Sequence, residues 1–239
     1  MPVDASIFRG LSAFPLTPAD AEGVVNTDAF AVMIDRVVAA GVDSIAVLGS
    51  TGTYAYLDRS ERSRALACAI ETIAGRIPLI AGIGAMRTSW VKELARDAER
   101  LGADGLLLAP VSYAPLTKDQ VFTHFEATAA ATGLPICIYN NPSTTHFGFS
   151  PELVSRLSRV TNTGAIKMPL PADGDCATEI GQLRSSCREG LMVSYSGDWG
   201  AAPALLAGAD AWYSVVAGLF PVPALRLTRA ALSGGRHRG

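Results

Sequence analysis

The stretch Pro135-Ile136-Cys137-Ile138-Tyr139-Asn140-Asn141-Pro142 contains a short apolar run that ends at two asparagines and a proline. Such a run, bounded by turn residues, is typical of a parallel strand that is covered on both faces. Similar runs recur about thirty residues apart, which is the size of one βα unit. These runs are Phe8 to Phe14, Ser44 to Leu48, Pro78 to Ala81, Gly105 to Ala109, Ala165 to Lys167, Leu191 to Ser194 and Trp212 to Val216.

Segments with helical periodicity separate the apolar runs. Between the first two runs, apolar residues fall at i, i+3, i+4, i+7 and i+8 and predict one buried helix face, namely Phe30, Met33, Ile34, Val37 and Val38. Gly41 follows as a stop signal. Helix starts are predicted where capping residues have the right spacing, at Asp58 with Glu61, at Thr117 with Gln120, and at Ser150 before Pro151.

Eight alternating units predict an α/β fold, a (β/α)8 TIM barrel formed by a single domain over residues 1–239. The length of 239 residues suits this fold, because a barrel of this kind typically needs about 250 residues. A doubly wound open sheet remains the alternative, because periodicity does not reveal whether a sheet closes.

Composition and charge exclude several classes of partner. The net charge is -2 and no block of Lys and Arg is present, so we expect no nucleic-acid partner. No apolar run approaches the roughly 20 residues of a membrane span, so we expect no membrane association and a cytoplasmic protein. The four cysteines and three histidines lack CxxC and HExxH spacing, so we predict reduced structural cysteines and no metal site.

Lys167 is one of only three lysines among the 20 basic residues, and it ends an apolar strand. The active sites of barrel enzymes lie at the carboxyl ends of the strands. Burial there lowers the pKa of an amine, and the neutral amine can attack a carbonyl carbon. The alternative is a lysine that merely extends from the strand end to solvent.

Tyr139 ends the strand that comes before the strand of Lys167. Neighbouring strands lie about 4.8 Å apart, so the two side chains should be close. The hydroxyl of Tyr139 would then move protons to and from a carbinolamine, which must lose water to become an imine. The alternative is a buried tyrosine that is hydrogen-bonded to a carbonyl group.

The turn Gly49-Ser50-Thr51-Gly52 follows the predicted strand Ser44 to Leu48. Glycines allow a turn to expose its backbone N–H groups, and such a turn can hold a carboxylate. The hydroxyls of Ser50 and Thr51 would extend the proton relay. Turns of this composition are common, so the motif is weak by itself.

Four motifs in this order resemble the dihydrodipicolinate synthase / N-acetylneuraminate lyase family, namely Gly49-Ser50-Thr51-Gly52, Tyr139-Asn140-Asn141-Pro142, Ala165-Ile166-Lys167 and Ser196-Gly197-Asp198. The resemblance extends from about Phe8 to about Leu227. It implies a (β/α)8 barrel, a homodimer or homotetramer, a small 2-oxo acid as substrate, and neither metal nor organic cofactor. It also implies that most of the family's C-terminal helical extension is lacking in this chain.

The resemblance further implies roles for individual residues. Lys167 would form the covalent imine, Tyr139 would lie above it, and Ser50 and Thr51 would bind the carboxylate. Tyr113 would be the second catalytic tyrosine, which in many members enters from the neighbouring subunit. The remaining residues expected to bind substrate are Thr144, Ser196, Gly197 and Tyr213.

Two positions depart from the family pattern. Thr53 stands where a glutamate usually follows the turn, and Thr144 stands where the synthases carry an arginine. A threonine hydroxyl cannot replace a guanidinium that binds a second carboxylate. We therefore expect a Schiff-base lyase or aldolase that cleaves or dehydrates a hydroxy-oxo acid. The alternatives are 4-hydroxy-tetrahydrodipicolinate synthase activity and a catalytically silent protein that binds a 2-oxo acid.

Overall fold

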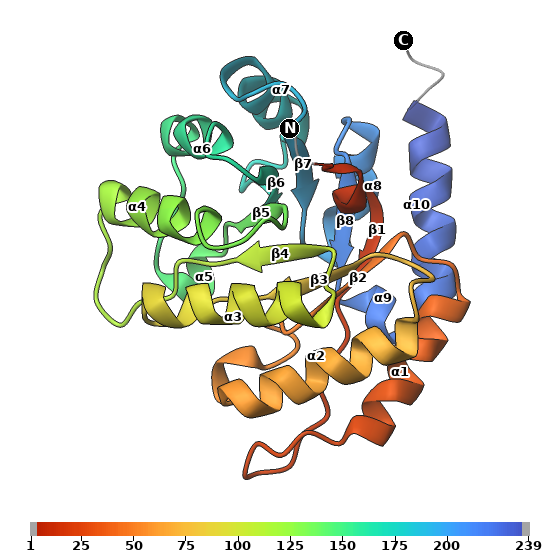
Figure 1. Cartoon of the computed structure of the whole chain (residues 1–239). Helices are drawn as coiled ribbons and strands as arrows, with labels where there is room; N and C mark the ends of the chain where they lie inside the picture. Colours follow the sequence, from red (N-terminus) through yellow and green to blue (C-terminus); the bar gives the residue numbers. More distant parts are fainter. Residues whose placement is uncertain (1–3, 236–239) are drawn as a thin grey trace.

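The computed structural model describes residues 4–235, which contain a closed barrel of eight parallel strands (Figure 1). The strands follow one another in sequence order, and β8 pairs with β1 to close the sheet. This closure confirms the predicted (β/α)8 TIM barrel and rules out the doubly wound alternative. The expected single domain over residues 1–239 also includes residues 1–3 and 236–239, which lie outside the described residues.

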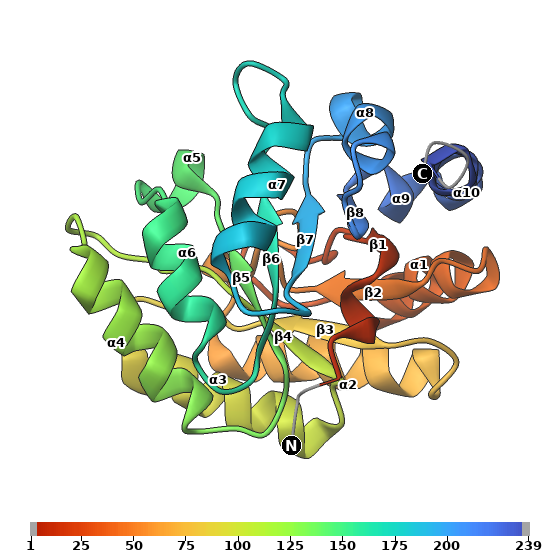
Figure 2. The same cartoon turned by 90° about the horizontal axis from the view of Figure 1, so that it is seen from above.

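The helices are arranged around the outside of the strands, as the view from above shows (Figure 2). The strands are β1 Gly10–Ala13, β2 Ser44–Val47, β3 Leu79–Gly82, β4 Gly105–Leu108, β5 Ile136–Tyr139, β6 Thr163–Met168, β7 Met192–Tyr195 and β8 Ala211–Ser214. The α-helices are α1 Thr27–Ala39, α2 Arg59–Ile73, α3 Thr88–Leu101, α4 Lys118–Ala129, α5 Pro142–Thr145, α6 Pro151–Ser158, α7 Cys176–Ser186, α8 Ala201–Leu206, α9 Val216–Leu219 and α10 Pro221–Gly235. The 3-10 helices are η1 Ser6–Phe8, η2 Tyr54–Tyr56 and η3 Asp198–Gly200.

Each predicted apolar run overlaps one strand, and the differences lie at the strand ends. One such difference is at β8, which stops at Ser214 although the apolar run continues to Val216. The Ser214 hydroxyl accepts a hydrogen bond from the Ala217 N–H at 2.9 Å, and the Val216 N–H donates to Asp198 at 3.1 Å. These bonds turn the chain into α9, so the two valines leave the sheet.

The predicted helix starts are correct at three places, with one difference in detail. Thr117 and Gln120 form a complete capping box at the start of α4, and Ser150 caps α6 ahead of a proline. Asp58 caps α2, but the side chain of Glu61 does not bond back to it. Glu61 instead accepts a hydrogen bond from the Val25 N–H at 2.7 Å, so a tertiary contact replaces the second half of the predicted box.

Buried side chains form an outer layer between the strands and helices and a smaller cluster inside the barrel. Along β5, Ile136 and Ile138 belong to the outer layer, whereas Cys137 and Tyr139 belong to the inner cluster. This alternation follows from the period of two in a β-strand. It determines which residues of each strand face the centre of the barrel.

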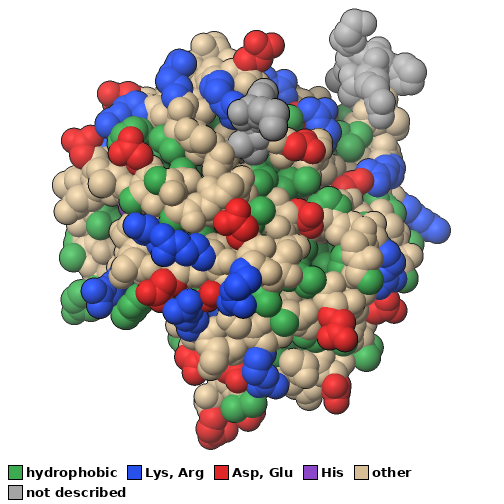
Figure 3. All heavy atoms as spheres, viewed as in Figure 1, with side chains coloured by type: hydrophobic (Ala, Val, Ile, Leu, Met, Phe, Trp, Pro, Cys, Tyr) green, Lys and Arg blue, Asp and Glu red, His purple; other side chains and the backbone are tan. Residues whose placement is uncertain are grey.

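Positive and negative side chains are interspersed on the face shown in Figure 3. Of the helices in the described part of the chain, none combines the length and the apolar character needed to cross a membrane.

Candidate active site

Residues from several strand ends meet at one end of the barrel, because parallel strands all finish there. The turn Gly49 to Gly52 follows β2, Tyr139 ends β5, and Lys167 is the penultimate residue of β6. The strands β5 and β6 are neighbours whose register pairs Tyr139 with Lys167. The closed sheet therefore places the predicted nucleophile beside the predicted proton relay.

The alternation of β6 directs the side chain of Lys167 into the barrel. Ile166 packs in the outer layer and Ala165 packs in the inner cluster, so Lys167, two residues after Ala165, faces inward. Its exposed fraction is 4%. None of the ion pairs formed among residues 4–235 involves Lys167. The amine is thus buried without a neutralising carboxylate in the described chain.

Two aromatic rings lie against the amine of Lys167. Its Nζ atom is 3.8 Å from the ring centroid of Phe14 and 4.2 Å from that of Tyr139. Cation–π attraction favours the ammonium form by about 0.5–2 kcal/mol, whereas full burial disfavours it by as much as about 3–5 pKa units, each worth about 1.4 kcal/mol. Burial dominates and lowers the pKa of Lys167 to about 7. A large fraction of the amine is therefore neutral near neutral pH.

Tyr139 is buried at the same end of the barrel, and its hydroxyl has two side-chain partners. The hydroxyl donates to Ser50 Oγ at 3.4 Å and accepts a hydrogen bond from Asn141 Nδ2 at 2.9 Å. Burial raises the pKa of Tyr139, and the bonds with Ser50 and Asn141 oppose that rise. The hydroxyl therefore keeps its proton at neutral pH and has a route for passing it on.

The turn after β2 has a sharply bent backbone. Leu48 has a φ of 57°, in the left-handed region, and a Cβ at Gly52 would lie 3.0 Å from both Leu48 N and Thr17 Oγ1. Within residues 4–235, the N–H groups of Ser50 and Thr51 donate to no backbone acceptor. These two groups can bind the carboxylate oxygens of a ligand.

Three of the remaining predicted residues lie on loops or short helices at the strand ends. Thr144 is exposed on α5, and its hydroxyl donates to the backbone oxygen of Asn141 at 3.4 Å. Ser196 donates to the backbone oxygen of Met168 at 3.1 Å. Gly197 has a φ of 100°, and a Cβ there would lie 2.7 Å from Leu170 Cδ1. A side chain at position 197 would therefore be strained and would also clash.

The two remaining tyrosines have opposite environments. Tyr113 is 94% exposed on the loop between β4 and α4, and among the described residues no hydrogen bond joins it to Lys167, Tyr139 or Ser50. Tyr213 is 1% exposed, its ring centroid is 6.0 Å from Lys167 Nζ, and its hydroxyl donates to the backbone oxygen of Phe8 at 3.4 Å. One chain therefore brings the ring of Tyr213, but not Tyr113, to the lysine.

Three residues of the site were given no chemical role on the basis of the sequence. Phe14 directly follows β1 and contacts Lys167, and its position at the end of the first predicted strand was a usable signal. Asp198 accepts hydrogen bonds from Trp212 Nε1 at 3.1 Å and from Ser214 Oγ at 2.9 Å, which ties the loop after β7 to β8. Asn141 bonds to Tyr139, and no local pattern indicates that contact.

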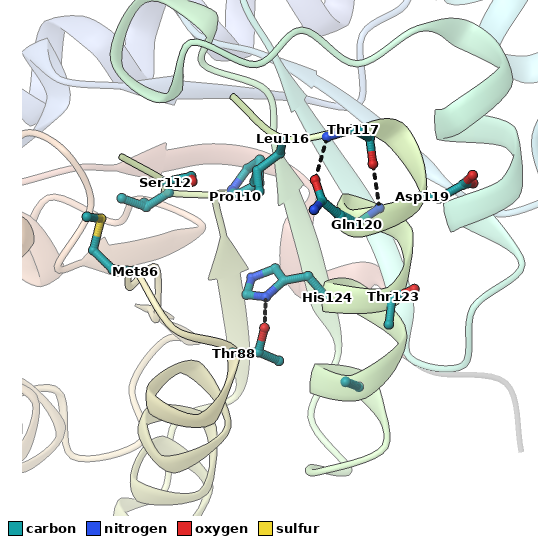
Figure 4. Close-up of a pocket in the computed structure, with 12 residues that line it drawn as sticks. Met86, Thr88, Pro110, Ser112, Leu116, Thr117, Asp119, Gln120, Thr123 and His124 are labelled. Carbon is teal, nitrogen blue, oxygen red and sulfur yellow. Dashed lines mark hydrogen bonds between the residues drawn. The ribbon is translucent and has the colours of Figure 1, made fainter. Parts of the chain in front are cut away.

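A separate cavity of about 470 Å³ lies between the loops that precede α3 and α4 (Figure 4). Its lining includes Met86, Pro110 and His124 and contains none of the predicted site residues. The Nδ1 atom of His124 is 2.9 Å from Thr88 Oγ1, and burial lowers the pKa of this histidine to about 4. The residues that line this cavity do not bring a nucleophile and a proton donor together as Lys167 and Tyr139 do. We therefore place the candidate active site at Lys167.

Potential metal ligands do not gather in the part of the chain that the structure describes. In that part, no group of three or more His, Cys, Asp or Glu residues is placed to hold a metal ion. Cys137 is fully buried in the inner cluster, and burial raises the pKa of its thiol to about 12. The thiol therefore stays protonated and acts as a small apolar side chain.

Comparison with known proteins adds independent information about this arrangement. The model of the Dihydrodipicolinate synthetase family matches residues 7–238. The 4-hydroxy-tetrahydrodipicolinate synthase of Pelobacter propionicus is 32% identical to this chain over 228 residues, which are 95% of this chain and 77% of that protein.

Solved structures match the whole barrel. The dihydrodipicolinate synthase from Agrobacterium tumefaciens str. C58 is 57% identical and has a TM-score of 0.95, with 98% of this chain and 78% of that chain covered. The chloride-inhibited dihydrodipicolinate synthase from Acinetobacter baumannii, solved in complex with pyruvate, is 28% identical and has a TM-score of 0.86. That match covers 96% of this chain and 78% of the other.

Proposed function

Because the chain belongs to the Dihydrodipicolinate synthetase family, we propose that it is a lyase in which Lys167 forms a Schiff base with pyruvate or a related 2-oxo acid. Enzymes of this family are lyases that use pyruvate through a lysine, without a metal cofactor. The observation that carries the assignment to Lys167 is its burial at the end of β6 with a pKa of about 7. The paired register with Tyr139 supports the same assignment.

The first chemical step is attack by the neutral Lys167 amine on the C2 carbonyl carbon of the acid. The resulting carbinolamine loses its hydroxyl group as water, using a proton that Tyr139 donates, and the nitrogen lone pair forms the C=N bond. The products of this step are a protonated imine, a water molecule and the Tyr139 phenolate. The imine then withdraws electrons from the bond that breaks or forms next to C3.

The carboxylate of the 2-oxo acid would bind at the turn after β2. The N–H groups of Ser50 and Thr51 that lack backbone acceptors support this assignment, together with the Ser50 hydroxyl that meets Tyr139. Ser196 and Gly197 would line the opposite side of the site. The ring of Tyr213 would support the lysine from within the barrel.

For the second substrate, Thr144 favours a neutral, hydroxylated group rather than a carboxylate. Its exposed hydroxyl has no charge to bind a second carboxylate, and the neighbouring Thr145 hydroxyl already bonds to the backbone oxygen of Asn141 at 2.9 Å. Aldol cleavage or dehydration of a 2-oxo-3-deoxy sugar acid fits this chemistry. The named activity of relatives such as the Pelobacter propionicus protein favours synthase activity as the second candidate.

We expect a homodimer or homotetramer in the cytoplasm, in which Tyr113 reaches the site of a neighbouring copy. The 94% exposure of Tyr113 within one chain is compatible with this expectation, because it leaves the ring free to contact a second copy. Nucleic acid and membrane are not expected as partners.

Borohydride reduction in the presence of pyruvate tests the Schiff base. Intact-mass analysis should show one pyruvyl adduct per chain, and peptide mapping should locate it at Lys167. Lys118→Ala, at an exposed lysine of α4, is the matched control and should be labelled like the parent. The proposal fails if folded parent protein gives no adduct or if Lys167→Ala is labelled equally well, and the first result would favour a silent binding protein.

Steady-state assays separate the two candidate reactions. Pyruvate with aspartate semialdehyde should be compared with a panel of 2-oxo-3-deoxy sugar acids and related hydroxy-oxo acids. We expect the highest kcat/KM of all these reactions to belong to a member of the panel of acids, not to the reaction with aspartate semialdehyde. A semialdehyde kcat/KM of about 10⁴ M⁻¹s⁻¹ or more, above that of every panel member, would assign the synthase reaction instead.

A further inference from the structure

Asn141 lies between the predicted proton relay and a second hydroxyl. Its Nδ2 donates to the Tyr139 hydroxyl at 2.9 Å, and its Oδ1 accepts a hydrogen bond from Ser143 Oγ at 2.8 Å. With the bond from Tyr139 to Ser50 at 3.4 Å, these contacts form a chain of four side chains that begins at the exposed Ser143. The two ends of the amide therefore have different partners.

The position of Asn141 in its helix makes this side-chain arrangement informative. It is the N-cap residue of α5, where an asparagine oxygen normally accepts a backbone N–H of the first turn, yet no such side-chain bond is present. The backbone oxygen of Asn141 instead accepts from the N–H groups of Thr144 and Thr145, at 3.1 and 3.0 Å. Replacing the side chain would leave these helix contacts in place.

The direction of the bonds determines what the Tyr139 hydroxyl can do. Because Asn141 donates to its oxygen, the hydroxyl proton is directed away from Asn141 and toward Ser50 and the space beside Lys167. When the proton leaves with the carbinolamine hydroxyl as water, the same N–H group stabilises the phenolate that remains. An apolar residue at position 141 would provide neither effect.

We infer that Asn141 is a positioning residue, which orients the proton of Tyr139 and stabilises its phenolate while the imine forms. This inference rests on the proposed Schiff-base function for its kinetic consequence. The hydrogen bond itself can be tested without any substrate. Three variants suffice, namely Asn141→Ala, Asn141→Asp and, as a control at an exposed amide of α7, Gln182→Glu.

The first measurement follows the ionisation of Tyr139 by NMR of tyrosine labelled with ¹³C at Cζ, with Tyr139→Phe used to assign the signal. The titratable groups near Tyr139 are Lys167 on β6, Tyr54 in η2, Tyr213 on β8 and Cys137 on β5, and Asp198 after β7 acts on Lys167. None of them is changed in the variants. Loss of the donor in Asn141→Ala should raise the pKa of Tyr139 by about one pH unit, and the carboxylate in Asn141→Asp should raise it further.

The second measurement is the rate of imine formation with pyruvate, followed by rapid quench with borohydride. We expect Asn141→Ala to lower the maximal rate about 10-fold or more. The pyruvate concentration that gives half of the maximal rate should stay within about threefold of the parent value. Asn141→Asp should be at least as slow, because a carboxylate accepts hydrogen bonds but does not donate one. Gln182→Glu should match the parent in both measurements.

The outcomes distinguish a failure of the proposed function from a failure of the role inferred for Asn141. A parent that forms no imine would overturn the proposed function, while a raised Tyr139 pKa in Asn141→Ala would still support the hydrogen bond. An unchanged pKa in both Asn141 variants would overturn the inference. The inference would also be overturned if Asn141→Asp formed the imine at the parental rate while Asn141→Ala was slow. That result would mean that Tyr139 donates its proton to residue 141, because a carboxylate can only accept.

Discussion

At the residue scale, the pKa of Lys167 determines the pH range in which the amine can react. Burial lowers this pKa to about 7, so the neutral fraction falls about tenfold for each pH unit below that value. We predict that the rate of borohydride-trapped imine formation at about pH 5 is roughly 100-fold below its plateau and levels off above about pH 8. A rate that keeps increasing up to about pH 10 would show that the lysine titrates as an ordinary exposed amine.

At Tyr139, which pairs with Lys167 in the sheet, the variant Tyr139→Phe separates the proton transfer by the hydroxyl from the packing of the ring. The ring contact with Lys167 remains in this variant, whereas the bonds to Ser50 and Asn141 are lost. We predict a fall in turnover of about 10²-fold or more, with a loss of unfolding free energy of no more than about 1.5 kcal/mol. Turnover within a few-fold of the parent, measured in the same steady-state assay, would exclude the hydroxyl as the relay.

At the scale of elements, the close approach of β2 and β3 depends on a missing side chain. A Cβ at Gly82, the last residue of β3, would lie 1.9 Å from the backbone oxygen of Leu48. The Cβ would be fixed to the backbone of β3, and Leu48 begins the turn after β2, so the two atoms cannot move apart without bending the turn that carries Ser50. We predict that Gly82→Ala lowers the unfolding free energy by about 3 kcal/mol or more.

Gly181→Ala provides the matched control for that prediction. Gly181 lies inside α7, and a Cβ there would meet nothing within 4 Å. Alanine is favoured over glycine inside a helix, so this variant should gain about 0.5–1 kcal/mol. Urea unfolding of both variants tests the pair, and a Gly82→Ala protein as stable as Gly181→Ala would refute the close approach.

At the scale of the whole molecule, the buried lysine should make the fold less stable. Between its folded pKa of about 7 and the ordinary value of 10.5, the unfolded chain holds a proton that the folded chain lacks. The free energy of unfolding therefore rises with pH across this window, by at most about 1.4 kcal/mol per pH unit from this group. The penalty is largest at or below pH 7.

Lys167→Met removes this penalty while keeping an unbranched side chain. We predict that the variant is more stable than the parent by about 2 kcal/mol at pH 7 and that the difference shrinks by about pH 9.5. Urea unfolding followed by tryptophan fluorescence measures both values. Lys118→Met, on the exposed surface of α4, should stay within about 0.5 kcal/mol of the parent. Equal stability of Lys167→Met and the parent at both pH values would contradict the buried, neutral amine.

The same unfolding curves bear on the domain organisation. We propose that the chain folds as one domain, because the closing pair of strands, β1 and β8, joins its first and last βα units. We expect tryptophan fluorescence and circular dichroism to report the same unfolding midpoint, which is the test of a single cooperative unit.

Much of the fold was determined by local sequence. The apolar runs and the capping residues Thr117 and Ser150 correctly predicted strands and helix starts, because such signals act between residues that are close in the chain. The same local reasoning correctly placed Lys167 and Tyr139 at strand ends, since the end of a strand can be read from where its apolar run stops. It failed at Glu61, whose partner Val25 is distant in sequence.

Tertiary structure alone decided closure, contacts and charge. Whether β8 pairs with β1 depends on the summed twist of eight strands, which no single segment encodes. The contact of Phe14 with Lys167 joins residues of the β1 and β6 regions that are far apart in the sequence, and only the closed sheet brings them to 3.8 Å. The pKa of about 7 at Lys167 likewise has a tertiary origin, because the surrounding strands and rings exclude the water that would stabilise the ammonium ion.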